Sequence, residues 1–102
     1  MEKIMTKDFT SKDLFNASSA TPINTIEGQT IEVSAVCIMD KVHGTTVGYL
    51  KGVDGKIYAT ISATVMEQMS ALADMVETAP QTIKVVARTS NQNRTYYQLE
   101  LV

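Results

Sequence analysis

Hydrophobic and polar residues alternate along both halves of the segment Gln81–Val102, which is divided by the polar pentad at residues 90–94. Alternation with a period of two on each side of turn-forming residues predicts a β-hairpin. Its buried face is expected to carry Ile83, Val85 and Ala87 from the first strand and Tyr97, Leu99 and Leu101 from the second. The other face then places Arg88 and Tyr96 outside, close to Arg94 at the tip.

A long strand is predicted over Thr30–Val42. Its first half alternates apolar and polar residues, whereas Val36-Cys37-Ile38-Met39 is apolar on both faces. This pattern is typical of a strand that is half exposed at first and buried on both sides later, or that carries a bulge near Val36. A long, bent first strand favours a small barrel, because it can pair with neighbours on both sides.

Two further strands, Thr46–Val53 and Lys56–Ser62, are expected to form a second hairpin. Asp54-Gly55 between them is the strongest two-residue turn signal in the chain. In the second strand the alternation predicts a buried face and an exposed face. The residues expected to be buried are Ile57, Ala59 and Ile61, and those expected to be exposed are Tyr58, Thr60 and Ser62.

The hydrophobic period changes to that of a helix over Ala63–Thr78. The apolar residues at helical spacing are Val65, Met69, Leu72 and Val76. Thr64 and Glu67 can form a capping box, with Ser62 as the competing cap, and Pro80 ends the pattern. We expect a helix of about twelve to fifteen residues.

Residues 1–28 are polar and rich in small residues, and we interpret them as a partly irregular N-terminal arm. Thr10 and Asp13 can cap a short helical turn that runs through Asn16. Met5 is an alternative start to Met1. Phe9, Leu14 and Phe15 are expected to be the apolar contacts of this helical turn, and Phe9, Leu14 and Ile23 are expected to hold the arm against the rest of the protein.

The elements follow one another as three strands, one helix and two strands, with residues 29–102 as a single domain. This order predicts a mostly β protein: a five-stranded Greek-key barrel with one α-helix between strands three and four, as in the OB-fold. The helix would close one end of the barrel, where adaptable Met66 and Met69 suit irregular packing. An open antiparallel sheet with the helix across one face is the alternative.

Size and composition are those of an ordinary globular domain, with 102 residues, 44% hydrophobic and 20% charged. The single cysteine, Cys37, excludes an internal disulfide and is expected to be a buried, inert thiol. No stretch approaches the ~20 apolar residues that span a bilayer, and the N-terminus lacks the apolar core of a signal peptide. We therefore expect a cytoplasmic protein without membrane contacts.

The sequence contains few of the residue patterns that enzyme active sites need. His43 is the only histidine and has no second histidine or cysteine near it in sequence, so a metal site is not expected. A Cys37–His43 nucleophile pair would need an exposed thiolate, and no phosphate-binding glycine loop is present. We expect no catalysis and no cofactor.

Several segments, taken together, point to one family. They are Asp54–Ser62 leading into the helix, Ile83–Val86, Arg88–Arg94, the closing Leu99–Val102 and Asp8–Asp13 in the arm. Together they resemble the small single-stranded-DNA-binding proteins of bacteriophages, over about residues 29–102. The resemblance implies an OB-fold, single-stranded DNA as ligand, and a role in phage replication or recombination in the bacterial cytoplasm. Asn93 stands where glycine would ease the turn, and asparagine tolerates left-handed conformations.

Binding single strands without base specificity needs aromatic faces that stack on bases and cations that follow the phosphates. A net charge of −2 argues against a strongly basic binder, but not against positive charge gathered on one face. The candidate stacking residues are Tyr49, Tyr58 and Tyr96, and the candidate phosphate contacts are Lys51, Lys56, Lys84, Arg88 and Arg94. Ordinary sheet packing and solvated surface are the alternative roles for these side chains.

These residues place the DNA across strands two and three and the last hairpin. RNA as ligand, homo-oligomer formation and contacts with replication proteins are left open by the sequence. A protein-interaction module is the rival from another class, in which an exposed strand edge or the apolar helix face docks onto a partner such as a host enzyme. Positive potential running from Lys56 past Tyr58 to Arg94 would favour DNA, and a flat apolar patch would favour a protein.

Overall fold

The computed structural model describes residues 4–40 and 44–102. Within them the chain is mostly β, with two α-helices and two short 3-10 segments. The elements are β1 (Ile4–Met5), α1 (Ser11–Asn16), η1 (Ala17–Ser19), β2 (Thr21–Pro22), η2 (Ile23–Ile26), β3 (Thr30–Asp40), β4 (Thr46–Gly52), β5 (Ile57–Thr60), α2 (Ala63–Val76), β6 (Gln81–Thr89) and β7 (Thr95–Leu101).

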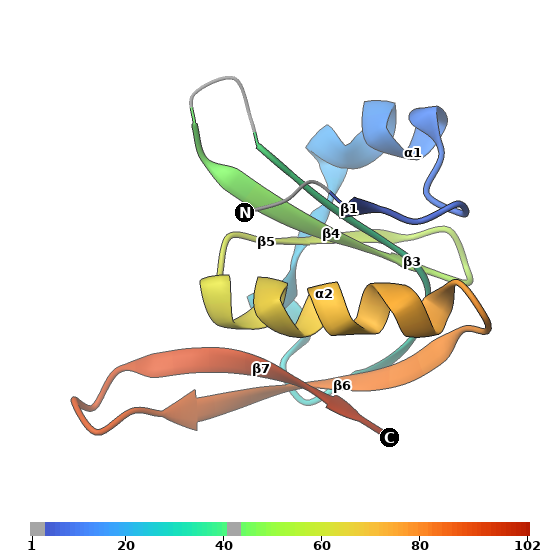
Figure 1. Ribbon diagram of the computed structural model, residues 1–102. Coiled ribbons are helices and arrows are strands. Elements are labelled where there is room, and N and C mark those ends of the chain that lie inside the picture. The colour runs from blue at the N-terminus through green and yellow to red at the C-terminus, as the bar shows by residue number, and fades with distance from the viewer. Residues whose placement is uncertain (1–3, 41–43) are drawn as a thin grey trace.

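The strands form one curled sheet with the order β2-β5-β4-β3-β6-β7, and β1 adds to β3. Every pair is antiparallel except β2 with β5. In Figure 1, α2 lies between the β3–β5 part of the sheet and the β6–β7 hairpin. Within the described residues, neither β2, at one end of this order, nor its neighbour β5 pairs with β7 at the other end. The result is a half-barrel, consistent with an OB-like barrel. The arm supplies two strands and two short 3-10 segments beyond the prediction, whereas its helix α1 corresponds to the predicted helical turn.

β3 is the long, bent strand that joins the two parts of the sheet. It pairs with β4 over Val33–Asp40 and with β6 over Thr30–Val33. The register with β4 shifts between Val33 and Ala35, which confirms an irregularity close to the predicted bulge. Because of this shift, the side chains of Val33 and Val36 both point into the same core. The predicted end of the strand at Val42 falls outside the described residues.

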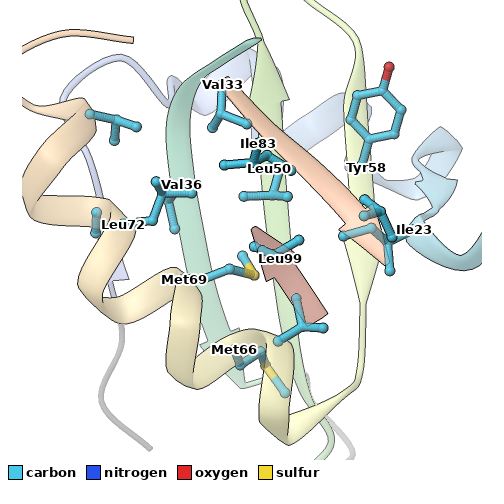
Figure 2. Packing of buried hydrophobic residues seen from close by; sticks show 14 of the residues in the cluster. Ile23, Val33, Val36, Leu50, Tyr58, Met66, Met69, Leu72, Ile83 and Leu99 are labelled. Atoms are coloured by element: carbon cyan, nitrogen blue, oxygen red, sulfur yellow. The ribbon is translucent and has the colours of Figure 1, made fainter. Parts of the chain in front are cut away.

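The larger core, here called the α2-side core, fills the space between the sheet and α2 (Figure 2). α2 has 14 residues, as predicted, and Ser62 is its cap, with the Val65 N–H donating to Ser62 Oγ at 3.3 Å. A Cβ added at Gly48 of β4 would lie 2.9 Å from Met69 Sδ. Glycine at this position therefore lets the helix approach the sheet closely. The members of the core include Val33, Val36, Ile38, Leu50, Tyr58, Val65, Met66, Met69, Leu72, Ile83, Val85 and Leu99.

The opposite face of β3, β4 and β5 is covered by the arm. The predicted capping box is confirmed, because Thr10 Oγ1 accepts from the Asp13 N–H at 3.2 Å and the Asp13 carboxylate accepts from the Thr10 N–H at 2.9 Å. Phe9 is buried as predicted, whereas Phe15 is 84% exposed, so its expected contact is wrong. The arm-side core consists of Phe9, Ala17, Ala35, Cys37, Val47 and Tyr49, with Leu14, Ala20, Met39, Ile57 and Ala59 packed against it.

One side chain ties α2 to the outermost strand of the sheet. The Gln68 amide donates from Nε2 to the Leu99 carbonyl at 2.8 Å, and Gln68 Oε1 accepts from the Leu99 N–H at 2.7 Å. This pair of bonds satisfies two backbone groups of β7 that face away from β6. Leu101, two residues further, is 59% exposed rather than buried, because it borders an open groove between α2 and β7.

Cys37 belongs to the arm-side core and is 1% exposed, as predicted. Burial raises the pKa of its thiol to about 11, so the unreactive protonated form is favoured.

In the described ranges, none of the helices is both long and apolar enough to cross a membrane.

Candidate nucleic-acid interface

The β6–β7 hairpin presents a cationic face to solvent. Its register pairs Lys84 with Glu100 and Arg88 with Tyr96, and residues paired in this way point to the same side of a sheet. Lys84 and Arg88 are exposed and Tyr96 is partly exposed, as the alternation predicted. Residues 81–102 carry three cations and one acidic side chain, although the whole chain has a net charge of −2. Positive charge is thus gathered on this element.

The tip of the hairpin is a compact turn organised by Ser90. The Ser90 N–H donates to the Arg94 carbonyl at 2.8 Å, and Ser90 Oγ accepts from the N–H groups of Gln92 and Arg94 at 3.3 and 3.2 Å. Asn93 has a φ of +58°, in the left-handed region that asparagine tolerates. The turn therefore holds the exposed Arg94 at a defined place.

Arg88 is held over the outer face by two neighbours. Its Nη2 lies 2.8 Å from Glu100 Oε2, and its Nε donates to Gln98 Oε1 at 3.3 Å. Both members of the ion pair have side chains that are 47% exposed, so the pair contributes little to stability. The guanidinium can exchange the carboxylate for a phosphate oxygen, beside the ring of Tyr96.

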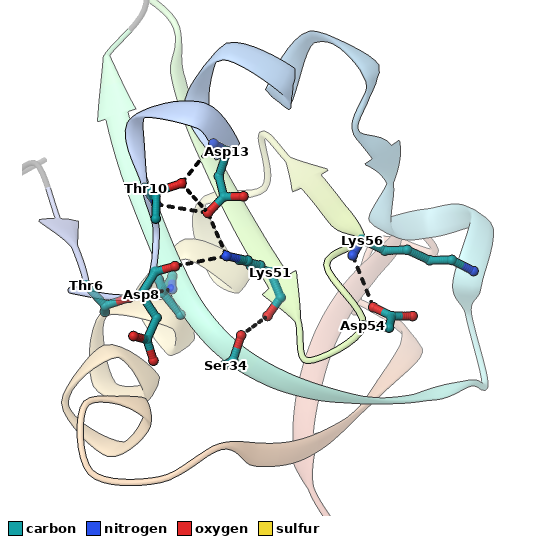
Figure 3. Close-up of polar contacts among 9 residues, drawn as sticks. Thr6, Asp8, Thr10, Asp13, Ser34, Lys51, Asp54 and Lys56 are labelled. Carbon is teal, nitrogen blue, oxygen red and sulfur yellow. Dashed lines mark hydrogen bonds and ion pairs between the residues drawn. The ribbon is translucent and has the colours of Figure 1, made fainter.

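The structure does not bring the other two candidate cations, Lys51 and Lys56, to the β6–β7 hairpin. Lys56 is exposed at the β4–β5 turn, which lies at the opposite end of the molecule in Figure 1. The expected exposure of Lys51 is wrong, because the arm covers it. Lys51 Nζ lies 2.7 Å from Asp13 Oδ2 and donates to the Asp8 carbonyl at 3.1 Å (Figure 3). A continuous path from Lys56 past Tyr58 to Arg94 is not formed.

The Lys51–Asp13 pair makes stability depend on pH in the acid range. Burial raises the pKa of the Asp13 carboxyl, but hydrogen bonds from Lys51 and Thr10 outweigh burial, so the pKa lies below its ordinary value of 3.8. The stability contribution is therefore present above that value and is lost as the pH falls through the lowered pKa. Thermal unfolding of Asp13→Asn should show a lower melting temperature at neutral pH and a smaller fall between about pH 5 and pH 3 than the wild type.

The matched control for this measurement is Asp74→Asn, which changes an exposed carboxylate on α2. It should keep the melting temperature close to that of the wild type. An Asp13→Asn profile that runs parallel to the wild-type profile would contradict the role of the pair.

Tyr49 and Tyr58 are buried, so the expected exposure of both is wrong. Tyr49 is 5% exposed beneath the arm, and its ring centroid lies 6.2 Å from that of Phe9, with 25° between the ring planes. Tyr58 is 8% exposed and belongs to the α2-side core (Figure 2). The cause is common to both: the arm covers one face of β4 and β5, and the α2-side core covers the other. Tyr96 and Tyr97 of β7 keep the most accessible positions.

A groove that the sequence analysis did not predict opens where the sheet is not closed. It has a volume of about 470 Å³ and runs between β2, η2 and β5 on one side and β7 on the other. Its lining includes Pro22, Asn24, Ile61, Ser62 and Tyr97. Ile61 is 74% exposed, so its expected burial is wrong, because β5 already ends at Thr60. Tyr97 packs partly against the α2-side core, as predicted.

Residues 4–40 and 44–102 contain no group of three or more histidine, cysteine, aspartate or glutamate side chains that could hold a metal ion. His43 lies outside these ranges.

Comparison with curated proteins and with solved structures finds no match. Comparison with protein families finds a match to the model of the Phage Single-stranded DNA-binding protein family over residues 4–102. The matched range includes the arm, both hairpins and α2. This nearly complete coverage agrees with the resemblance carried by the separate segments. The chain therefore belongs to the family of phage single-stranded DNA-binding proteins.

Proposed function

We propose that the protein binds single-stranded DNA through the outer face and tip of the β6–β7 hairpin, with little sequence preference. It protects transient single strands during phage replication or recombination in the cytoplasm of the bacterial host. Family membership supports the ligand. The observation that supports the location is that Lys84, Arg88 and Arg94 all belong to one hairpin of an acidic chain, where Arg88 is paired with Tyr96. Stacking and phosphate contacts are tolerant of sequence and require no cofactor.

In this proposal the β6–β7 hairpin supplies the last two strands of an OB-like barrel. β3, β4 and β5 are then the first three strands, α2 follows the third, and residues 1–28 are an added arm. In OB-folds the loop between the last two strands is one of those that bind nucleic acid. The turn at residues 90–94 takes that position.

The charges on α2 support the same orientation. The exposed acidic residues Glu67, Asp74 and Glu77 lie on or directly after the helix, and a carboxylate surface repels phosphates. The apolar stripe of α2 is itself buried in the α2-side core. This stripe is therefore not exposed for docking onto a protein partner, which was one form of the rival hypothesis.

Arg94→Ala is expected to weaken binding of oligo-dT roughly tenfold at low salt, because one charge-assisted contact contributes about 1.5 kcal/mol. The slope of log K against log salt should decrease in magnitude by about 0.7, the value for one phosphate contact on a single strand. Tyr96→Leu should also weaken binding, but with an unchanged salt slope, because stacking releases no counterions. Fluorescence titration at several salt concentrations measures both quantities.

The control is Lys12→Ala, which removes an exposed cation of α1 instead. It should leave the affinity within about twofold of the wild type, as expected for a charge outside the interface. Equal losses in Lys12→Ala and Arg94→Ala would move the interface away from the hairpin. No binding of oligo-dT by the wild type, even at low salt, would refute the proposed function.

A further inference from the structure

Ile61 has an exposed apolar side chain on a segment of backbone that is fixed by hydrogen bonds. It stands between the last residue of β5 and the cap of α2, with 74% of its surface exposed. The backbone on its C-terminal side is fixed, because the Ser62 N–H donates to Thr60 Oγ1 at 3.0 Å and the Met66 N–H donates to the Ser62 carbonyl at 3.0 Å. The isoleucine is therefore positioned by the fold and not by a mobile loop.

Ile61 forms one wall of the open groove, and β7 forms the other. Tyr97 comes from β7, and Pro22 of β2 adds a further apolar surface to the lining. Asn24 and Ser62 contribute an amide and a hydroxyl, which can donate and accept hydrogen bonds. The described lining contains no carboxylate, so nothing there repels a polyanion. The volume of about 470 Å³ lies within the roughly 300–1,000 Å³ of clefts that bind small ligands.

The groove is continuous with the proposed DNA-binding hairpin. Tyr96 and Tyr97 are consecutive residues of a strand, so their side chains point to opposite faces of β7. Tyr96 lies on the cationic outer face, and Tyr97 lines the groove. Arg94 lies one residue before β7, at the end of the strand from which both of its faces can be reached. A single strand held at the tip by Arg94 can reach both surfaces.

We propose that the groove between Ile61 and Tyr97 is a nucleobase-binding site, into which one base of the bound single strand inserts. The base lies against the apolar walls, and Asn24 and Ser62 face its polar edge. The Asn24 amide can present either its oxygen or its N–H groups, and the Ser62 hydroxyl can still donate while its oxygen caps α2, so the site takes any base. The inference rests on the proposed function and adds a second surface to it.

The test is Ile61→Ser, titrated with oligo-dT of about 16 nucleotides, the upper site size of one OB-fold. We expect an affinity loss of about fivefold or more, as for loss of a base contact. The salt slope should stay unchanged, because no phosphate contact is removed. The melting temperature should also stay unchanged, since the side chain is exposed. An oligomer of abasic deoxyribose phosphates should bind equally to the variant and the wild type.

Val53→Ser is the matched control, because Val53 is 53% exposed and lies in the β4–β5 connection. It should bind oligo-dT like the wild type. As the chain has no tryptophan, Ile61→Trp and Val53→Trp each introduce a single emission probe. Oligo-dT should quench the first and leave the second unchanged.

Three results would overturn the nucleobase site: wild-type affinity for oligo-dT in Ile61→Ser, an equal loss in Val53→Ser, or an equal loss with the abasic oligomer. In each case a weakened Arg94→Ala would still support binding at the hairpin. Failure of the wild type to bind oligo-dT would instead refute the proposed function itself.

Discussion

Phe9→Ala should lower the free energy of unfolding by about 3–5 kcal/mol, the usual cost of truncating a buried phenylalanine. Phe9 is 2% exposed and stacks on Tyr49, so the arm loses its main anchor on the sheet. The cavity would lie between the arm and β4, where neighbouring side chains come from separate segments. Urea unfolding followed by circular dichroism measures the change. Removal of the ring should also increase the quenching of tyrosine fluorescence by acrylamide, because Tyr49 becomes accessible.

Phe15→Ala is the control of the same residue type on the same arm. Phe15 is 84% exposed, so the change should stay within about 0.5 kcal/mol. A small effect of Phe9→Ala, comparable to that of Phe15→Ala, would mean that the arm does not contribute to the stability of the folded protein.

Gln68→Leu should destabilise the protein by about 2–6 kcal/mol. It removes both bonds to the Leu99 backbone, and each buried polar group left without a partner costs about 1–3 kcal/mol. Leucine has a similar size, so the loss reports on hydrogen bonding more than on packing. The freed N–H and C=O groups of β7 also form an open strand edge, which favours association with other chains. Urea unfolding and size-exclusion chromatography measure the two effects.

The control is Gln92→Leu, an exposed glutamine in the hairpin turn. It should be close to neutral in stability and remain in the elution position of the wild type. Wild-type stability of Gln68→Leu would show that the amide does not support the edge of β7.

The sequence was sufficient for elements whose partners are near in the chain. The helical period of α2 and the turns at Asp54-Gly55 and residues 90–94 act locally, and the structure has all three. The orientation of β5 could not be predicted in this way. Alternation separates the two faces of a strand but does not say which is covered, and in β5 both are covered. Tyr58 therefore points into a core, although its neighbours Ile57 and Ala59 are more apolar.

The candidate site was predicted only where it depends on a single hairpin. Arg88 and Tyr96 could be placed on one face because their pairing follows from the turn between them. Burial of Tyr49 depends on Phe9, and partial burial of Lys51 depends on Asp13; both partners are about forty residues earlier in the chain. A contact over that separation leaves no local pattern. Exposure of Ile61 depended on where β5 ends, and strand ends are poorly marked by alternation alone.

The close approach of α2 to Gly48 has a chemical consequence. Met66 and Met69 are 3% and 0% exposed, and the sulfur of Met69 packs so closely on Gly48 that a Cβ added there would lie 2.9 Å away. Oxidation to the sulfoxide adds a polar oxygen to the sulfur, so we expect these two buried methionines to react more slowly than exposed ones in the folded protein. Met5, which is 51% exposed, has no such protection. The extent of oxidation at Met5 should therefore report exposure of the protein to oxidant, whereas oxidation at Met66 and Met69 should report how often the α2-side core opens.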